Sequence, residues 1–67
     1  MIYTDRLGPI TVKVVDTKVG TLYVDTIDRN AAEASIRTVY PDAAEANRVI
    51  ELVFSTPDAH PNKYHGD

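Results

Sequence analysis

The segment ITVKVVDTKVGTLYVDTI, residues 10–27, decides the fold that we expect for this chain of 67 residues. It contains two runs of alternating, mostly β-branched residues, ITVKVV at 10–15 and TLYVDTI at 21–27. They are separated by five residues that end in Gly20. Two such runs around a short loop with glycine are typical of a β-hairpin. We therefore predict an antiparallel hairpin over residues 10–27.

The alternation of side chains also predicts the register of this hairpin. If Val15 lies opposite Thr21, one face of the hairpin is largely apolar and the other is mostly polar. A shift by one residue would mix the two faces. One face should therefore be buried and the other solvated. The side chains expected on the solvated face are Thr11, Lys13, Tyr23 and Asp25.

A helix is expected after the hairpin, over residues 31–40. This stretch is rich in alanine, and Asn30 followed three residues later by Glu33 fits a capping box with Asn30 as the N-cap. Pro41 should end the helix near Tyr40. A helix of about ten residues is stable only when it is docked. Its apolar face, formed by Ala32, Ile36, Val39 and Tyr40, should therefore cover the hairpin.

The segment RVIELVF, residues 48–54, fits two structures. As a helix capped by Asp42, it places Ala46, Val49, Ile50, Val53 and Phe54 on one face. As a strand, it is rich in β-branched residues and places Ile50, Leu52 and Phe54 on one face. Leu52 fits only the strand, and a lone hairpin gains stability from a third strand. We favour the strand.

These elements predict an α+β domain over residues 1–54, with the element order ββαβ and the strand order 2-1-3. Residues 1–3 are expected to add at most a short edge strand. The alternative is a hairpin followed by two helices. Residues 55–67 contain Pro57 and Pro61 without apolar periodicity, so we expect an extended or flexible tail.

Composition narrows the classes of function. The net charge is −3 and the seven basic residues are spread along the chain, which disfavours direct binding to nucleic acid. The sequence shows neither a signal peptide nor an apolar run long enough for a membrane span. The absence of cysteine fits a cytoplasmic protein.

No catalytic, cofactor-binding or metal-ligating residue is predicted. Ser35 lies within the expected helix, and His60 and His65 lie in the tail, where nothing would hold them beside a nucleophile. Asp58 with the two histidines matches no strong metal motif. So short a chain is also expected to lack room for a pocket of a few hundred Å³. The chain is therefore expected to be no enzyme and to use no cofactor.

Three surfaces remain as candidates for binding a protein partner. The first is the solvated hairpin face with Thr11, Lys13, Tyr23 and Asp25, because tyrosine among mixed charges is typical of interfaces. The second is the pair of sheet edges, which also favours a homodimer by strand addition. On the strand interpretation of residues 48–54, Val49 and Val53 lie on the outer face there. The third is the tail, with Lys63 and Tyr64.

The stretches TLYVDTID, NAAEASIRTVYPDA and RVIELVF, within residues 21–54, resemble many small phage-encoded proteins in element order and style. The same order resembles some small anti-CRISPR proteins. This resemblance implies a protein that acts in the host cytoplasm, where it binds a host complex and blocks it. Because the chain is neither strongly basic nor strongly acidic, occlusion of a protein surface is the expected mode.

The leading hypothesis is thus a non-enzymatic protein-binding module, of the kind that phages use to inhibit or modulate a host protein complex. One alternative is a self-associating structural or accessory protein. Another, less favoured, is a small regulator that binds nucleic acid.

Overall fold

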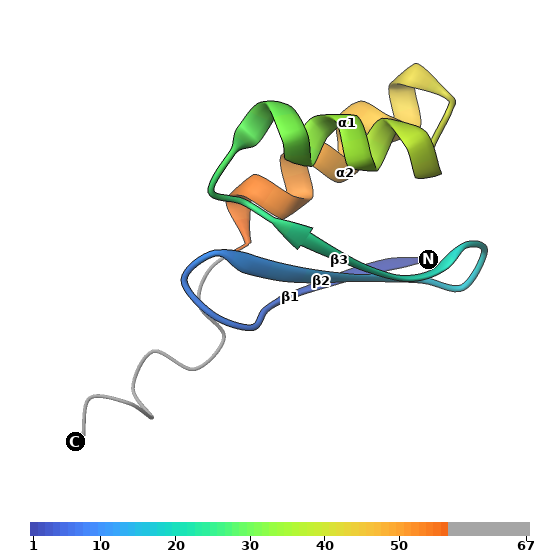
Figure 1. Cartoon of the computed structure of the whole chain (residues 1–67). Coiled ribbons are helices and arrows are strands. Elements are labelled where there is room, and N and C mark those ends of the chain that lie inside the picture. The colour runs from blue at the N-terminus through green and yellow to red at the C-terminus, as the bar shows by residue number, and fades with distance from the viewer. Residues whose placement is uncertain (57–67) are drawn as a thin grey trace.

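Three antiparallel strands form a sheet, and two helices cover one side of it (Figure 1). The computed structural model describes residues 1–56. Within this range, the other side of the sheet carries no helix or strand. The elements in chain order are β1 (Ile2–Arg6), β2 (Thr11–Asp16), β3 (Gly20–Asp25), α1 (Arg29–Val39) and α2 (Ala43–Ser55).

The predicted hairpin and its register are confirmed. β2 pairs with β3 antiparallel, with Val15 opposite Thr21 and Lys13 opposite Tyr23. The connecting turn closes when the Asp16 carboxylate accepts a hydrogen bond from the Lys18 N–H at 2.8 Å. Gly20 has a φ of 96°, a conformation that side chains with a Cβ rarely adopt.

The predicted order ββαβ with the strand order 2-1-3 is wrong, although the α+β class is correct. The third strand is β1, which comes before the hairpin and pairs with β2, so that the strand order is β1-β2-β3. Residues 1–3 were expected to add only a short strand, but the pairing continues to Arg6 opposite Val12. The alternative of a hairpin followed by two helices fits the rest of the chain.

The strand predicted at residues 48–54 is therefore also wrong, because these residues form most of α2. Val49 and Val53 are both fully buried, whereas Leu52 is 37% exposed. That pattern has the period of a helix whose apolar face is turned to the core. The predicted cap is present, since the Asp42 carboxylate accepts a hydrogen bond from the Glu45 N–H at 3.0 Å.

The first helix begins earlier than predicted. Its N-cap is Asp28, not Asn30, because the Asp28 carboxylate accepts a hydrogen bond from the Ala31 N–H at 3.2 Å. The C-cap is Tyr40, directly before Pro41, as expected. At the other end of the domain, α2 continues to Ser55 and the Thr56 carbonyl accepts a hydrogen bond from Arg6 at 3.0 Å. Ser55 thus belongs to α2, and Thr56 is hydrogen-bonded to β1.

The core lies between the sheet and the two helices. The hairpin contributes Val12, Val14 and Val24, as its alternation predicts. The helices contribute the faces that their spacing predicts, and their buried members are Ala32, Ile36, Tyr40, Ala46, Val49, Ile50 and Val53. Because all of these residues pack on one side of the sheet, the opposite side faces solvent.

Candidate functional site

The uncovered side of the sheet is the most distinctive surface of the described chain. We call it the open face, and it consists of every second residue of the three strands. Its members are Tyr3, Asp5, Thr11, Lys13, Val15, Thr21, Tyr23 and Asp25. Two large aromatic side chains stand out on it, because Tyr3 is 56% and Tyr23 is 62% exposed.

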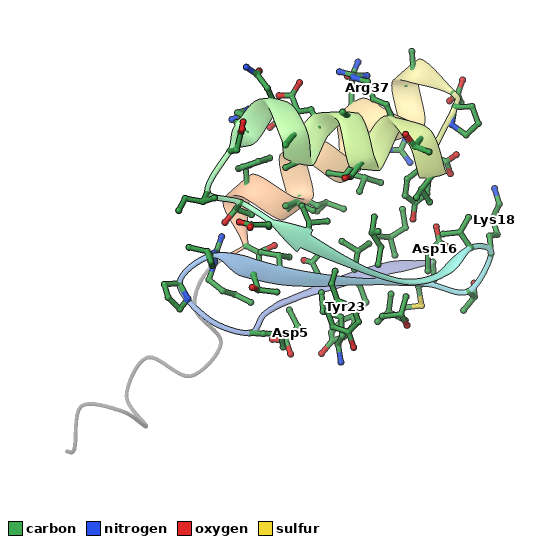
Figure 2. All side chains as sticks on the ribbon, viewed as in Figure 1. Asp5, Asp16, Lys18, Tyr23 and Arg37 are labelled. Atoms are coloured by element: carbon green, nitrogen blue, oxygen red, sulfur yellow. The ribbon has the colours of Figure 1, made fainter. Side chains whose placement is uncertain are left out.

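Lys13 occupies the middle of the open face. The register places Asp5 beside it on β1 and Tyr23 beside it on β3. Figure 2 shows Asp5 and Tyr23 on the side of the sheet that faces away from the helices. The face thus holds one ammonium group and two carboxylates, those of Asp5 and Asp25. One oxygen of Asp25 accepts a hydrogen bond from the Ile27 N–H at 3.0 Å.

The four hairpin residues predicted from the sequence are brought together on this face. Thr11 lies opposite Asp25, and Lys13 lies opposite Tyr23. Sequence reasoning missed the contribution of β1, above all Tyr3 and Asp5. The alternation of residues 2–6, with Ile2 turned toward the core and Tyr3 away from it, identifies them only once β1 is known to pair with β2.

The other predicted binding residues have different outcomes. Val49 and Val53 are buried in the core and present nothing to a partner. The prediction that they lie on the outer face of a strand is wrong, because residues 48–54 belong to α2. Lys63 and Tyr64 lie outside the residues that the structure describes, as do Asp58, His60 and His65.

A second feature lies at the end of the sheet near the β2–β3 turn. Contrary to our expectation from chain length, a groove of about 330 Å³ opens here between β1, this turn and α2. It is lined by Ile2, Asp16, Lys18, Glu45, Arg48 and Leu52. The Lys18 Nζ lies 3.8 Å from a carboxylate oxygen of Glu45. Two of the charged groups that line the groove thus pair with each other.

Asp16, at the base of this groove, is a buried carboxylate with two partners. It accepts hydrogen bonds from the Lys18 N–H and from the Tyr40 hydroxyl, each at 2.8 Å. Figure 2 shows it on the helix side of the sheet. The Lys18 N–H above all, and then the Tyr40 hydroxyl, hold the pKa of Asp16 below its ordinary value. A carboxylate so held stays ionised at neutral pH, and its two hydrogen bonds join the turn to the end of α1.

Burial, followed by the hydrogen bond to Asp16, raises the pKa of Tyr40 from 10.0 to about 12. A group whose pKa is raised on folding stabilises the fold below its unfolded value, and that stability is lost as the pH rises through the folded value. We therefore expect the protein to lose stability between pH 10 and pH 12. Tyr40→Phe should lack this loss. Urea unfolding at a series of alkaline pH values measures it.

At neutral pH, Tyr40→Phe should lower the free energy of unfolding by about 1–3 kcal/mol, because a buried acceptor loses a partner. Tyr23→Phe, on the open face, is the matched control and should change neither quantity. If Tyr40→Phe and the unchanged protein lose stability in parallel above pH 10, the assignment to Tyr40 is wrong.

Between residues 1 and 56, no three histidine, aspartate or glutamate side chains cluster closely enough to hold a metal ion. Neither α1 nor α2 is long and apolar enough to cross a membrane. Comparison with known proteins finds no matching family model, no matching curated protein and no matching solved structure. The open face is therefore judged on its own chemistry.

Proposed function

We propose that this chain is a non-enzymatic binding module that attaches to another protein through its open face. The observation that carries the proposal is the one-sided packing of the domain. Both helices lie on one side of the sheet (Figure 1). On the other side, Tyr3 and Tyr23 are exposed. Exposed aromatic residues gathered on one face of a small domain are typical of a binding surface.

The side chains of the open face suit contact with a protein. Tyrosine offers a large apolar area together with one polar group, and few rotamers have to be ordered on binding. Val15 adds apolar surface between the tyrosines, and Lys13 can lay its methylene groups along it. The same face is poorly suited to nucleic acid, because it carries more carboxylates than ammonium groups.

The size of the face indicates the kind of complex. Three strands spaced by about 4.8 Å and about 20 Å long cover an area of about 300 Å². A stable protein interface needs about 800 Å² from each partner. The open face alone therefore supports weak binding, and tight binding requires that the interface extend beyond it.

The mode of action that fits this surface is occlusion. A domain that covers part of another protein denies that part to other ligands and needs no chemistry of its own. A phage-type inhibitor of a host complex, of the anti-CRISPR kind, is the specific form of this proposal. That resemblance depends on an element order in which residues 48–54 are a strand. Because they belong to α2, the proposal is based on the open face instead.

Site-specific photocrosslinking tests the proposal. A photoreactive phenylalanine analogue at position 23 or position 3 should crosslink the chain to one and the same host protein in a lysate. The analogue at position 30, on exposed helix surface, is the control and should give no such product. With the captured protein purified, Tyr3→Ala and Tyr23→Ala should each weaken binding by about 2 kcal/mol, which is about thirtyfold.

Two results would contradict this assignment. One is an equal yield of the same product from position 30. The other is unchanged affinity when both tyrosines are replaced in a chain that is still folded. Crosslinks to a second copy of this chain do not count as support, because they report self-association.

A further inference from the structure

The outer edge of β3 presents a row of backbone groups that no described strand uses. The Thr26 N–H donates to the Ile10 carbonyl at 2.7 Å, which sets the phase of the β2–β3 ladder. Hydrogen-bonded and non-bonded pairs alternate in an antiparallel ladder. Since Thr26 is bonded to β2, so are the residues two and four positions earlier, Val24 and Leu22. The residues between and beside them direct their N–H and C=O groups outward. These are Thr21, Tyr23 and Asp25.

β3 has few of the features that usually protect an edge strand, and its one charged residue, Asp25, stands at its end. Natural edges are blunted by lysine, proline, bulges or inward-facing charges. The strand GTLYVD has no lysine or proline, and its register with β2 is unbroken. The opposite edge, β1, carries Arg6, whose side chain donates to the Thr56 carbonyl at the end of α2. Of the two edges, β3 is therefore the better candidate for pairing with another strand.

We propose that a second copy of this chain occupies this edge, with the two β3 strands antiparallel around a two-fold axis at Tyr23. Such an axis runs perpendicular to the sheet. It joins the two sheets into one sheet of six strands, and it keeps the helices of both copies on the same side. An isologous contact of this kind closes on itself and leaves no further β3 edge free.

The sequence of β3 is self-complementary in this register. On the helix side, Leu22 of each copy lies opposite Val24 of the other, so apolar residues meet. On the open face, the two Tyr23 rings lie side by side, and each Asp25 lies opposite a threonine, Thr21. Aromatic and apolar cross-strand pairs stabilise a sheet, whereas directly opposed like charges destabilise it.

The neighbouring registers are poorer. In any antiparallel pairing of the two copies, the residues with outward N–H and C=O groups must lie opposite each other. The neighbouring registers therefore place the two-fold axis one residue earlier or later along β3. An axis at Leu22 brings Gly20, whose φ of 96° belongs to the turn, opposite Val24. An axis at Val24 leaves Thr21 outside the paired stretch. An axis at Asp25 places the two Asp25 carboxylates against each other.

The flank of α1 above this edge is compatible with a second copy. α1 contacts β3, so pairing the β3 strands brings the two α1 helices close together. α2 lies on the side of Arg37, whose guanidinium donates to the Asn47 side chain at 3.0 Å. Successive residues are about 100° apart around the axis of a helix. The flank of α1 opposite Arg37 is therefore formed by Ala31, Ser35 and Thr38, which are all exposed. Small residues there allow the close helix approach that strand pairing imposes.

Self-association would also enlarge the proposed binding surface. Two open faces joined at β3 form one continuous face of about 600 Å², twice the area that one copy supplies. Two copies of Tyr23 would stand at its centre. The dimer does not depend on the proposed function, since its argument concerns the edge of β3 alone.

Hydrogen exchange and sedimentation test the dimer on the intact chain. We expect the mass to double between micromolar and millimolar concentration. Over the same range, the Thr21, Tyr23 and Asp25 amides should become protected from exchange. In a mixture of labelled and unlabelled chains, the methyl groups of Leu22 should show contacts with those of Val24 of the other copy. A monomeric mass throughout, or a dimer in which these amides stay unprotected, overturns the proposal.

Two variants and a control make the test specific. Thr21→Pro removes an outward N–H, so the two-fold dimer loses two hydrogen bonds, one from each copy. The substitution breaks no hydrogen bond to β2. Ser35→Arg, which leaves the strands intact, places two guanidinium groups together near the axis. Each should raise the dissociation constant about tenfold or more, whereas Asn30→Arg on the outer surface of α1 should not. A dimer unchanged by both substitutions overturns the proposal. If the unsubstituted chain is a monomer and still crosslinks to a host protein from position 23, the proposed dimer is overturned but the proposed function stands.

Discussion

Val53→Asp should abolish folding, whereas Leu52→Asp, one residue earlier, should leave the domain folded. Val53 is fully buried and belongs to the apolar core, so a carboxylate at this position would lie among apolar side chains. An uncompensated buried charge costs about 3–5 kcal/mol. That equals the whole stability of about 3–5 kcal/mol that a core of this size supplies. Circular dichroism and urea unfolding of both variants measure the difference.

Leu52→Asp is the matched control, because it makes the same chemical change on the exposed side of the same helix turn. Leu52 is 37% exposed, so its replacement should change the free energy of unfolding only slightly. The opposite outcome, in which Leu52→Asp unfolds the chain and Val53→Asp is tolerated, would show that residues 48–54 form a strand. Equal effects of both substitutions would fit neither structure.

The same residues explain why the sequence alone did not decide between strand and helix. Ile50 and Phe54 are four residues apart, a spacing that places both on one face of a helix and also on one face of a strand. Among the apolar positions of residues 48–54, only Leu52 fits the strand alone, and only Val49 and Val53 fit the helix alone. The decision depends on β1. Once β1 completes the sheet, the apolar face of the sheet needs a second helix to cover it, and α2 supplies that cover.

The hairpin half of the open face could be predicted because its information is local. Alternation within residues 10–27 places Lys13 and Tyr23 on one face whatever the rest of the chain does. The β1 half could not be assigned in this way. Gly8 and Pro9 mark a turn, but a turn does not reveal whether the residues before it pair with those after it. Tyr3 and Asp5 join the face only through that pairing.

The Asp16–Tyr40 hydrogen bond could not be predicted for a similar reason. The two residues are 24 positions apart, and each had another local explanation. Asp16 begins the hairpin loop, and Tyr40 continues the apolar face of α1. Their contact follows from the angle at which α1 docks on the sheet, which neither local pattern contains.

Ile36→Ala should lower the free energy of unfolding by about 2–5 kcal/mol. Ile36 is fully buried on the inner face of α1, where it packs between the sheet and α2. Its replacement leaves a cavity in a core that has few other residues to close it. Because a domain of this size holds only about 3–5 kcal/mol in total, a large fraction of the chains should be unfolded at room temperature. Urea unfolding followed by circular dichroism gives the change.

Ile36→Val, which removes one methyl group, should cost only about 0.5–1.5 kcal/mol, and Thr38→Ala on the exposed side of α1 should cost less. If Ile36→Ala is as stable as Thr38→Ala, Ile36 does not lie at the centre of the core.

The stability of Ile36→Ala should also depend on protein concentration, because association of folded chains through β3 stabilises the folded state by mass action. Unfolded Ile36→Ala should therefore regain structure as its concentration rises, and Ile36→Ala combined with Ser35→Arg should not.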